Sequence, residues 1–147
     1  MLFESFLQSD YLKKRIGYDS EVDLIPFSID PENNLLYASS RRQLDIDDFA
    51  SHILEIMKHP KFTQQNAYYN FYNVESVTGD PDRLKVVASR LQQCRDLESG
   101  PAKVAIYCSP NSVLQKALRS YVLSAEGSVL WYKFFHDKFE ALGWLHS

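Results

Sequence analysis

The sequence predicts an α/β fold: a mixed five-stranded sheet that opens with a hairpin, continues in βα units and carries about four helices. Three observations predict it. Strand-like and helix-like segments alternate from residue 23 onward. The segment at residues 103–107 is a short apolar run without alternation, which is typical of a buried parallel strand. Turn-forming or helix-capping residues stand at most junctions between segments.

The first two strands are predicted to pair as a hairpin. The strand-like segments 24–29 and 35–40 flank the turn sequence DPENN at residues 30–34. Asp and Asn favour turns because their side chains bond to nearby backbone, and Asn also tolerates a positive φ. A connection this short indicates antiparallel strands.

Two helices are predicted in the middle of the chain, with a strand at residues 67–74 between them. The first helix follows Asp45, and the second begins with Asp80 as its cap and Pro81 at its first position. Apolar residues recur at helical spacing in both. These are Phe49, Ala50, Ile53 and Met57 in the first helix, and Leu84, Val87, Ala88 and Leu91 in the second.

The C-terminal third is predicted as strand 103–107, a helix ended by Gly127, strand 129–135 and a helix at 137–145. Ser109 as cap and Pro110 at the first position would begin the earlier helix. Asp137 and Glu140 have the spacing of a capping box for the last one. We expect Trp144 to dock that last helix on the sheet.

Composition and charge exclude several classes of protein. The chain has 147 residues, and we expect residues 1–22 to be an N-terminal extension, with a short docking helix, and residues 23–147 to be a single domain. A net charge of -3 argues against general nucleic-acid binding. No apolar stretch reaches the length of about 20 residues that spans a bilayer, so no integral membrane segment is expected. With only two cysteines, a reducing cytoplasm is predicted.

The C-terminal half carries a family resemblance. The stretch VAIYCSP, a following helix and then SVLWYKFFHDKFEALGWL resemble the STAS-like proteins, the group of sulfate-transporter and anti-sigma-factor-antagonist domains. The match is closest to their stand-alone bacterial branch, the stage II sporulation protein AA-like proteins. RQLDIDDFASHI, at residues 42–53, resembles the start of a helix in the same group. The resemblance implies a bacterial, non-enzymatic regulatory domain that acts through an unidentified protein partner, with a homodimer as a further assembly to test.

One loop departs from the pattern of the resembled family. Its signalling members carry an Asp-Ser-(Ser/Thr)-Gly loop that is phosphorylated at a helix start, whereas residues 75–80 here read ESVTGD. Thr78 and Gly79 still keep a hydroxyl beside the helix start. We therefore predict a partner-binding loop that does not need phosphorylation, formed by Ser76, Thr78, Gly79 and Asp80.

The loop at residues 108–112, CSPNS, lacks what catalysis requires. A cysteine phosphatase needs an arginine six residues after its cysteine, and Leu114 stands there. A serine nucleophile elbow needs flanking glycines, and this loop has none. We interpret Cys108 as a small buried hydrophobic residue. No catalytic residues, and hence no enzyme activity, are predicted.

A polar stripe on the first predicted helix has the residue types of a metal site. Asp48, His52, Glu55 and His59 lie in one narrow sector, and imidazoles with carboxylates can bind zinc. The predicted core face, with Phe49 and Ile53, points away from them. We therefore interpret the stripe as a solvated polar face. Neither a metal nor another cofactor is expected.

The strand segment AYYNFYNVES at residues 67–76 is unusually aromatic and polar for a strand that is buried on both faces. Its hydroxyls and amides need partners if they are buried; in the simplest case they reach the ends of the sheet or water. The alternative function is binding of a small amphipathic ligand or lipid at the carboxyl ends of the strands. The pocket wall would then be Tyr69, Asn70, Phe71 and Tyr72.

Overall fold

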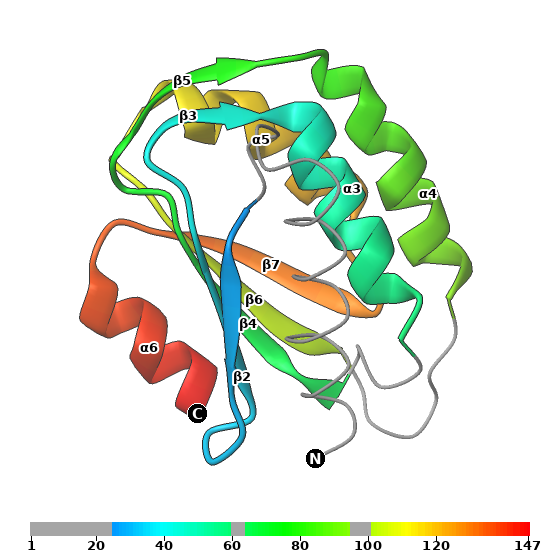
Figure 1. Ribbon diagram of the computed structural model, residues 1–147. Coiled ribbons are helices and arrows are strands. Elements are labelled where there is room, and N and C mark those ends of the chain that lie inside the picture. Colours follow the sequence, from blue (N-terminus) through cyan, green and yellow to red (C-terminus); the bar gives the residue numbers. More distant parts are fainter. Residues whose placement is uncertain (1–24, 60–63, 95–100) are drawn as a thin grey trace.

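The computed structural model describes residues 25–59, 64–94 and 101–147, and its main sheet has the strand order β1-β2-β4-β6-β7 (Figure 1). The strands are β1 (Phe27–Asp30), β2 (Leu35–Ser39), β4 (Asn66–Asn70), β6 (Ala102–Tyr107) and β7 (Leu130–Phe135). β1 runs antiparallel to β2, and the other neighbours are parallel. The predicted mixed five-stranded sheet is therefore confirmed.

The predicted hairpin is confirmed as β1 and β2. Oδ1 of Asp30 accepts hydrogen bonds from the backbone N–H groups of Glu32 at 3.0 Å and Asn33 at 3.3 Å. Asn34 takes the left-handed conformation, with φ of 52°. The polar side chains of the turn thus replace ladder hydrogen bonds where the chain reverses.

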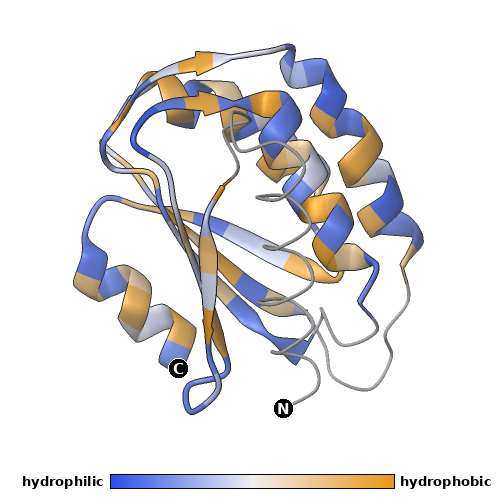
Figure 2. Cartoon of the chain, viewed as in Figure 1, coloured by the Kyte–Doolittle hydropathy of each residue, from blue (hydrophilic) through white to orange (hydrophobic). Residues whose placement is uncertain are grey.

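Helices cover both faces of the main sheet (Figure 1). The helices α3 (Ile46–Met57), α4 (Leu84–Gln93) and α5 (Val113–Ser124) lie on one side, and α6 (Lys138–His146) lies on the other. Apolar residues recur along α3 and α4 between polar ones (Figure 2). The larger core lies under α3, α4 and α5, and a smaller one lies under α6. The unequal layers follow from three amphipathic helices sharing one face.

Most predicted helix starts are confirmed. Asp45 caps α3, Asp137 caps α6, and Asp80 caps a short 3₁₀ turn, η3 (Pro81–Arg83), which leads into α4. The predicted start of α5 at Ser109 and Pro110 is wrong. Its cap is Ser112, whose hydroxyl accepts from the N–H of Gln115. The physical reason is Asn111, whose φ of 56° turns the chain before a helix can continue from Pro110.

A second, two-stranded parallel sheet was not predicted. It pairs β3 (Arg42–Asp45) with β5 (Val74–Thr78) at the rim of the molecule. The prediction of one strand over residues 67–74 is wrong in its second half, because β4 ends at Asn70. Oδ1 of Asn70 accepts from the backbone N–H of Tyr72 at 3.2 Å, which is a local turn bond that competes with the ladder.

Two further findings concern the sequence predictions. The docking helix expected within residues 1–22 lies outside the described residues. Over the described ranges, none of the helices has the length and apolar character that crossing a membrane requires.

Candidate functional site

The small sheet brings the starts of two helices together. β3 leads into α3 and β5 leads into η3, and their parallel register sets Asp45 opposite Thr78. The hydroxyl of Thr78 donates to Oδ2 of Asp45 at 3.0 Å and accepts from Nε2 of Gln43 at 3.1 Å. Thr78 is therefore engaged as a donor and as an acceptor, and it holds the two helix starts side by side.

Carboxylates cap both helix starts. Oδ1 of Asp45 accepts from the N–H groups of Asp47 at 2.8 Å and Asp48 at 3.1 Å. Oδ1 of Asp80 accepts from the N–H of Asp82 at 3.0 Å. A negative charge is stabilised at a helix N-terminus, since the first N–H groups lack intrahelical partners. The site thus carries fixed negative charge without any modification.

Gly79 allows the close approach of these two helix starts. Its φ is +91°, a conformation that residues with a side chain rarely adopt. A Cβ at this position would lie 3.1 Å from Cβ of Ile46, the first residue of α3. Gly79 is thus required both by its backbone angle and by the space left for it.

The four residues predicted as a partner-binding loop lie along the end of β5 and at the entry to η3, and we call them the interaction edge: Ser76, Thr78, Gly79 and Asp80. Ser76 lies within β5 rather than in a loop, and it is exposed, as are Gly79 and Asp80. Thr78 is partly buried by its hydrogen bonds. The contribution of β5 to this edge was missed because the Asn70 turn was not recognised in the sequence.

The residues predicted as a pocket wall separate onto different surfaces. Tyr69 and Phe71 are buried in the larger core, where both pack on the ring of Phe49. Asn70 is partly buried on the other face, and Tyr72 is exposed against Tyr107, with ring centroids 4.9 Å apart. The alternation of a strand places neighbouring side chains on opposite faces, so the four share no single wall.

His52 corrects the interpretation of the polar stripe on α3. It is only 1% exposed, and its Nε2 lies at hydrogen-bond distance, 2.9 Å, from the Tyr69 hydroxyl. The ring of Phe27 in β1 packs on it at 5.5 Å. The prediction of a solvated face failed at His52 because β1 covers that side of α3. Within the ranges that the structure describes, no group of three or more His, Cys, Asp or Glu could hold a metal ion.

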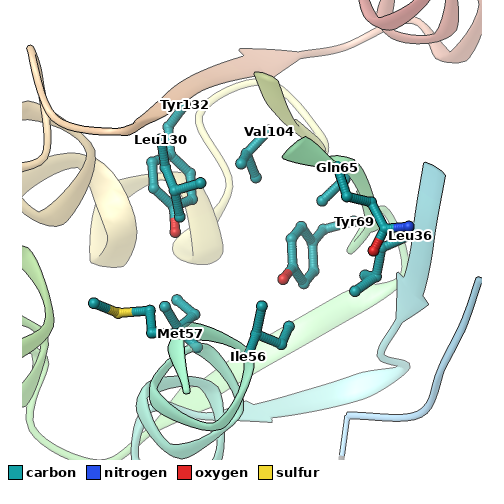
Figure 3. Close-up of a pocket in the computed structure, with 10 residues that line it drawn as sticks. Leu36, Ile56, Met57, Gln65, Tyr69, Val104, Leu130 and Tyr132 are labelled. Carbon is teal, nitrogen blue, oxygen red and sulfur yellow. The ribbon is translucent and has the colours of Figure 1, made fainter. Parts of the chain in front are cut away.

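A small, partly open cavity of about 30 Å³ lies between α3 and the sheet (Figure 3). Tyr69 and Tyr132 extend into this space from the sheet, and Ile56 and Met57 meet them from α3. The volume suits one or two waters rather than a metabolite, because ligand pockets measure roughly 300–1,000 Å³. This cavity is therefore too small to hold a metabolite.

The opposite face carries a cluster of tyrosines beside α6. The ring of Tyr68 lies between those of Tyr37 and Tyr107, with centroid distances of 6.0 Å and 6.4 Å. An open groove of about 460 Å³ runs over this face at the carboxyl ends of β2 and β4. Its lining includes Ser28, Tyr37, Ser39, Tyr68, Asn70 and Lys138. We call it the tyrosine groove.

The Tyr68 hydroxyl is buried without a hydrogen bond to any of the described residues. Such a group destabilises a fold by about 1–3 kcal/mol unless something satisfies it. Burial, with smaller contributions from Tyr107 and Tyr37, raises the pKa of Tyr68 to about 12. The hydroxyl is therefore protonated at neutral pH and able to donate. Sequence reasoning missed Tyr68, although its alternation with Tyr69 signals that it faces the other side.

Cys108 is fully buried just after the end of β6. Its loop lies between a strand and a helix, where nucleophile loops occur, but it lacks the arginine and glycines that such loops require. Burial raises the pKa of its thiol, although a hydrogen bond with Ser112 acts in the opposite direction. A thiol that stays protonated is a poor nucleophile. The imidazole of His136, which follows β7, is engaged with the backbone of this loop, since its Nδ1 lies 3.0 Å from the Cys108 carbonyl oxygen.

Comparison with known proteins supports the fold. No family model matches the chain, and no curated protein is similar to it in sequence. Among solved structures it is similar to an uncharacterized protein of the DUF3478 family with a SpoIIAA-like fold from Shewanella loihica PV-4. The two are 19% identical with a TM-score of 0.50, over 88% of this chain and 99% of that one. The element order, the mixed sheet and this likeness together identify the chain as a protein with a SpoIIAA-like, and hence STAS-like, fold.

Proposed function

We propose that this protein is a non-enzymatic regulatory domain that binds a protein partner through the interaction edge, with no need for phosphorylation. The observation that carries the proposal is the bonding of Thr78. Its hydroxyl is held between Asp45 and Gln43, so the exposed Asp80 carboxylate of the edge lies beside a helix start that a second carboxylate, that of Asp45, already caps. Carboxylates beside exposed strand backbone give a partner a negative charge to bind, in the way that a phosphate group would.

The exposed strand β5 supports the same surface. Ser76 and Glu75 are exposed on it, and β5 pairs only with β3 in the small sheet of the described residues. Open strand edges are common docking sites for extended segments of partner proteins. Carboxylates at one end of such an edge would favour a partner segment with a basic residue at the matching position.

The experiment is position-resolved crosslinking in the native cell. A photo-crosslinking residue is placed at Ser76, with Glu126 as the control position, which is also exposed but lies in the loop after α5. We expect one partner to be captured from Ser76 and not from Glu126. Capture should weaken about 10-fold in Asp80→Ala and only about 2-fold in Thr78→Ala, which loosens the arrangement of the helix starts but keeps the Asp80 carboxylate.

Two results would decide against the proposal. If Thr78→Ala abolishes capture and intact mass shows phosphate on nearly every wild-type molecule, the edge is a phosphorylation switch. If neither substitution changes capture, the recognition surface lies elsewhere. A second copy of this chain at the Ser76 crosslink would identify the partner as a homodimer, which light scattering can measure directly.

A second candidate function, binding of a small amphipathic ligand, is favoured by one specific observation. The buried Tyr68 hydroxyl has no partner among the described residues, and the side chain that carries it contributes to the lining of an open groove. The two functions use different surfaces. The interaction edge lies at the small sheet, and the tyrosine groove lies on the α6 face of the main sheet.

A further inference from the structure

The tyrosine groove lies where α6 leaves the sheet uncovered. α6 packs over β4, β6 and β7, while the groove runs beside it over β1, β2 and β4. Its volume of about 460 Å³ falls within the range of about 300–1,000 Å³ that small-molecule sites occupy. Its place at the carboxyl ends of parallel strands is where open α/β sheets bind ligands.

The walls of the groove favour an amphipathic occupant. Tyr37 and Tyr68 meet edge to face, which leaves aromatic surface for an apolar body to pack against. Ser28, Ser39 and Asn70 add polar groups on the same lining. A purely apolar ligand would leave these polar groups without partners, and a purely polar one would not use the rings.

Two donors determine the chemistry of the polar end. The Tyr68 residue is only 4% exposed, and its hydroxyl is not bonded to any residue that the structure describes. Lys138, at the first position of α6, is the only basic or acidic side chain among the described lining residues. A hydroxyl donor that is buried beside the groove, without a bond to any described residue, and an ammonium group on its lining are together complementary to an acceptor that carries negative charge.

We propose that the tyrosine groove binds a small amphipathic carboxylate, whose apolar body packs on Tyr37 and Tyr68 while its acid group meets the Tyr68 hydroxyl and Lys138. This assignment gives a site and a ligand class to the second candidate function, on which it rests. It does not depend on the interaction edge, which shares no residue with the groove.

The test compares three probes with the same apolar body: phenylbutyrate, phenylbutanol and phenylbutylamine. Each is titrated calorimetrically into the full-length protein at neutral pH and low salt. We expect phenylbutyrate to bind with a dissociation constant of about 1 mM or lower, because a ligand of its size contributes limited energy per atom. The alcohol should bind about 5-fold more weakly, and the amine should bind least because it meets Lys138 with like charge.

Variants locate the site and separate binding from folding. Tyr68→Phe deletes only the hydroxyl, so phenylbutyrate should bind about 5-fold more weakly while the melting temperature stays equal or rises. Lys138→Gln should weaken the acid about 3-fold and leave the alcohol unchanged. The matched controls are Tyr72→Phe, an exposed tyrosine outside the lining, and Lys116→Gln, an exposed lysine on α5; neither should change any of the three affinities.

Three outcomes overturn the proposal. These are no measurable binding of phenylbutyrate, equal binding of the three probes, and phenylbutyrate binding that is unchanged in both Tyr68→Phe and Lys138→Gln. The crosslink from Ser76 provides a separate readout. If the Tyr68→Phe variant is still captured from Ser76 but no longer binds phenylbutyrate, the groove and the edge are independent sites. If the groove fails these tests, the proposal for the edge is unaffected and is judged by the crosslinking result.

Discussion

The hydroxyl of Thr78 donates a hydrogen bond to Oδ2 of Asp45, whose other carboxylate oxygen caps α3. One side chain therefore connects the end of β5 to the start of a helix whose cap lies 33 residues earlier in the sequence. The Thr78 hydroxyl therefore has a structural role in the unmodified protein.

Removing that hydroxyl should destabilise the protein. We expect Thr78→Val to lower the free energy of unfolding by about 1–2 kcal/mol, because Asp45 and Gln43 both lose a partner. Thr78→Ser keeps the hydroxyl and should cost less than about 0.5 kcal/mol. Urea denaturation measures both. Equal stability of Thr78→Val and wild type would show that the hydrogen bonds contribute nothing.

Gly79 is expected to be intolerant of substitution for two separable reasons. Gly79→Ala should destabilise the fold by about 2–4 kcal/mol, because alanine is strained at a positive φ and its Cβ would press on Ile46. Gly127→Ala is the matched control: φ there is +81°, but no atom lies within 4 Å of the added Cβ. It should cost only about 1 kcal/mol. Thermal unfolding of the two variants isolates the contact, and equal losses would show that it has no energetic weight.

The last helix should depend on Trp144, which is partly buried against Trp131 and Phe135 with ring centroids 5.2 Å and 5.4 Å away. We expect Trp144→Ala to cost about 2–4 kcal/mol, somewhat less than truncation of a fully buried tryptophan. The control is Phe139→Ala on the same helix, where the side chain is 80% exposed and the loss should be below about 0.5 kcal/mol. An unchanged urea midpoint for Trp144→Ala would mean that α6 is not docked through this residue.

Alkaline pH should destabilise the protein through a buried tyrosine pair. The hydroxyls of Tyr121 and Tyr132 bond to each other, and burial raises the pKa of both well above its usual value. Above about pH 10 the unfolded chain loses these protons while the folded protein keeps them, so the unfolded state binds fewer protons and stability falls as pH rises. The double variant Tyr121→Phe with Tyr132→Phe should show a shallower fall. An identical slope in urea denaturation across this pH range would contradict the assignment.

Cys108 should be unreactive in the folded protein. Burial raises the pKa of its thiol, whereas Cys94, at the end of α4, is only partly buried. In single-cysteine variants, a thiol reagent near neutral pH should label the Cys94 protein at least about 100-fold faster than the Cys108 protein. Denaturant should remove the difference. Rapid labelling of Cys108 in the folded chain would reopen the possibility of a nucleophile in its loop.

Local patterns were sufficient for much of this fold. Asp45, Asp80 and Asp137 could be recognised as caps because a cap is decided by a side chain and the N–H groups two or three residues later. The hairpin was predictable for the same reason, since its turn is held by bonds within residues 30–34. The failure at Ser109 was also local, because the positive φ of Asn111 outweighed the preference of Pro110 for a helix start.

Contacts between distant segments determined the candidate sites. The turn at Asn70 divides a predicted strand and frees β5 to pair with β3, and this pairing alone brings Thr78 to Asp45. Likewise, His52 is buried because β1 folds over it, which no periodicity within its own helix could reveal.

The α/β class and the order of most elements could be predicted from the sequence, because spacing and capping act over a few residues. The resemblance to STAS-like proteins rested instead on sequence motifs, most of them in the C-terminal half. Which face of β4 packs against which layer of helices depends on contacts between distant segments and is visible in the folded protein alone. Tyr69 is bonded in the larger core while its neighbour Tyr68 is left without a partner among the described residues, beside an open groove. Alternation places adjacent residues on opposite faces, but it does not say how much of each face a helix will cover.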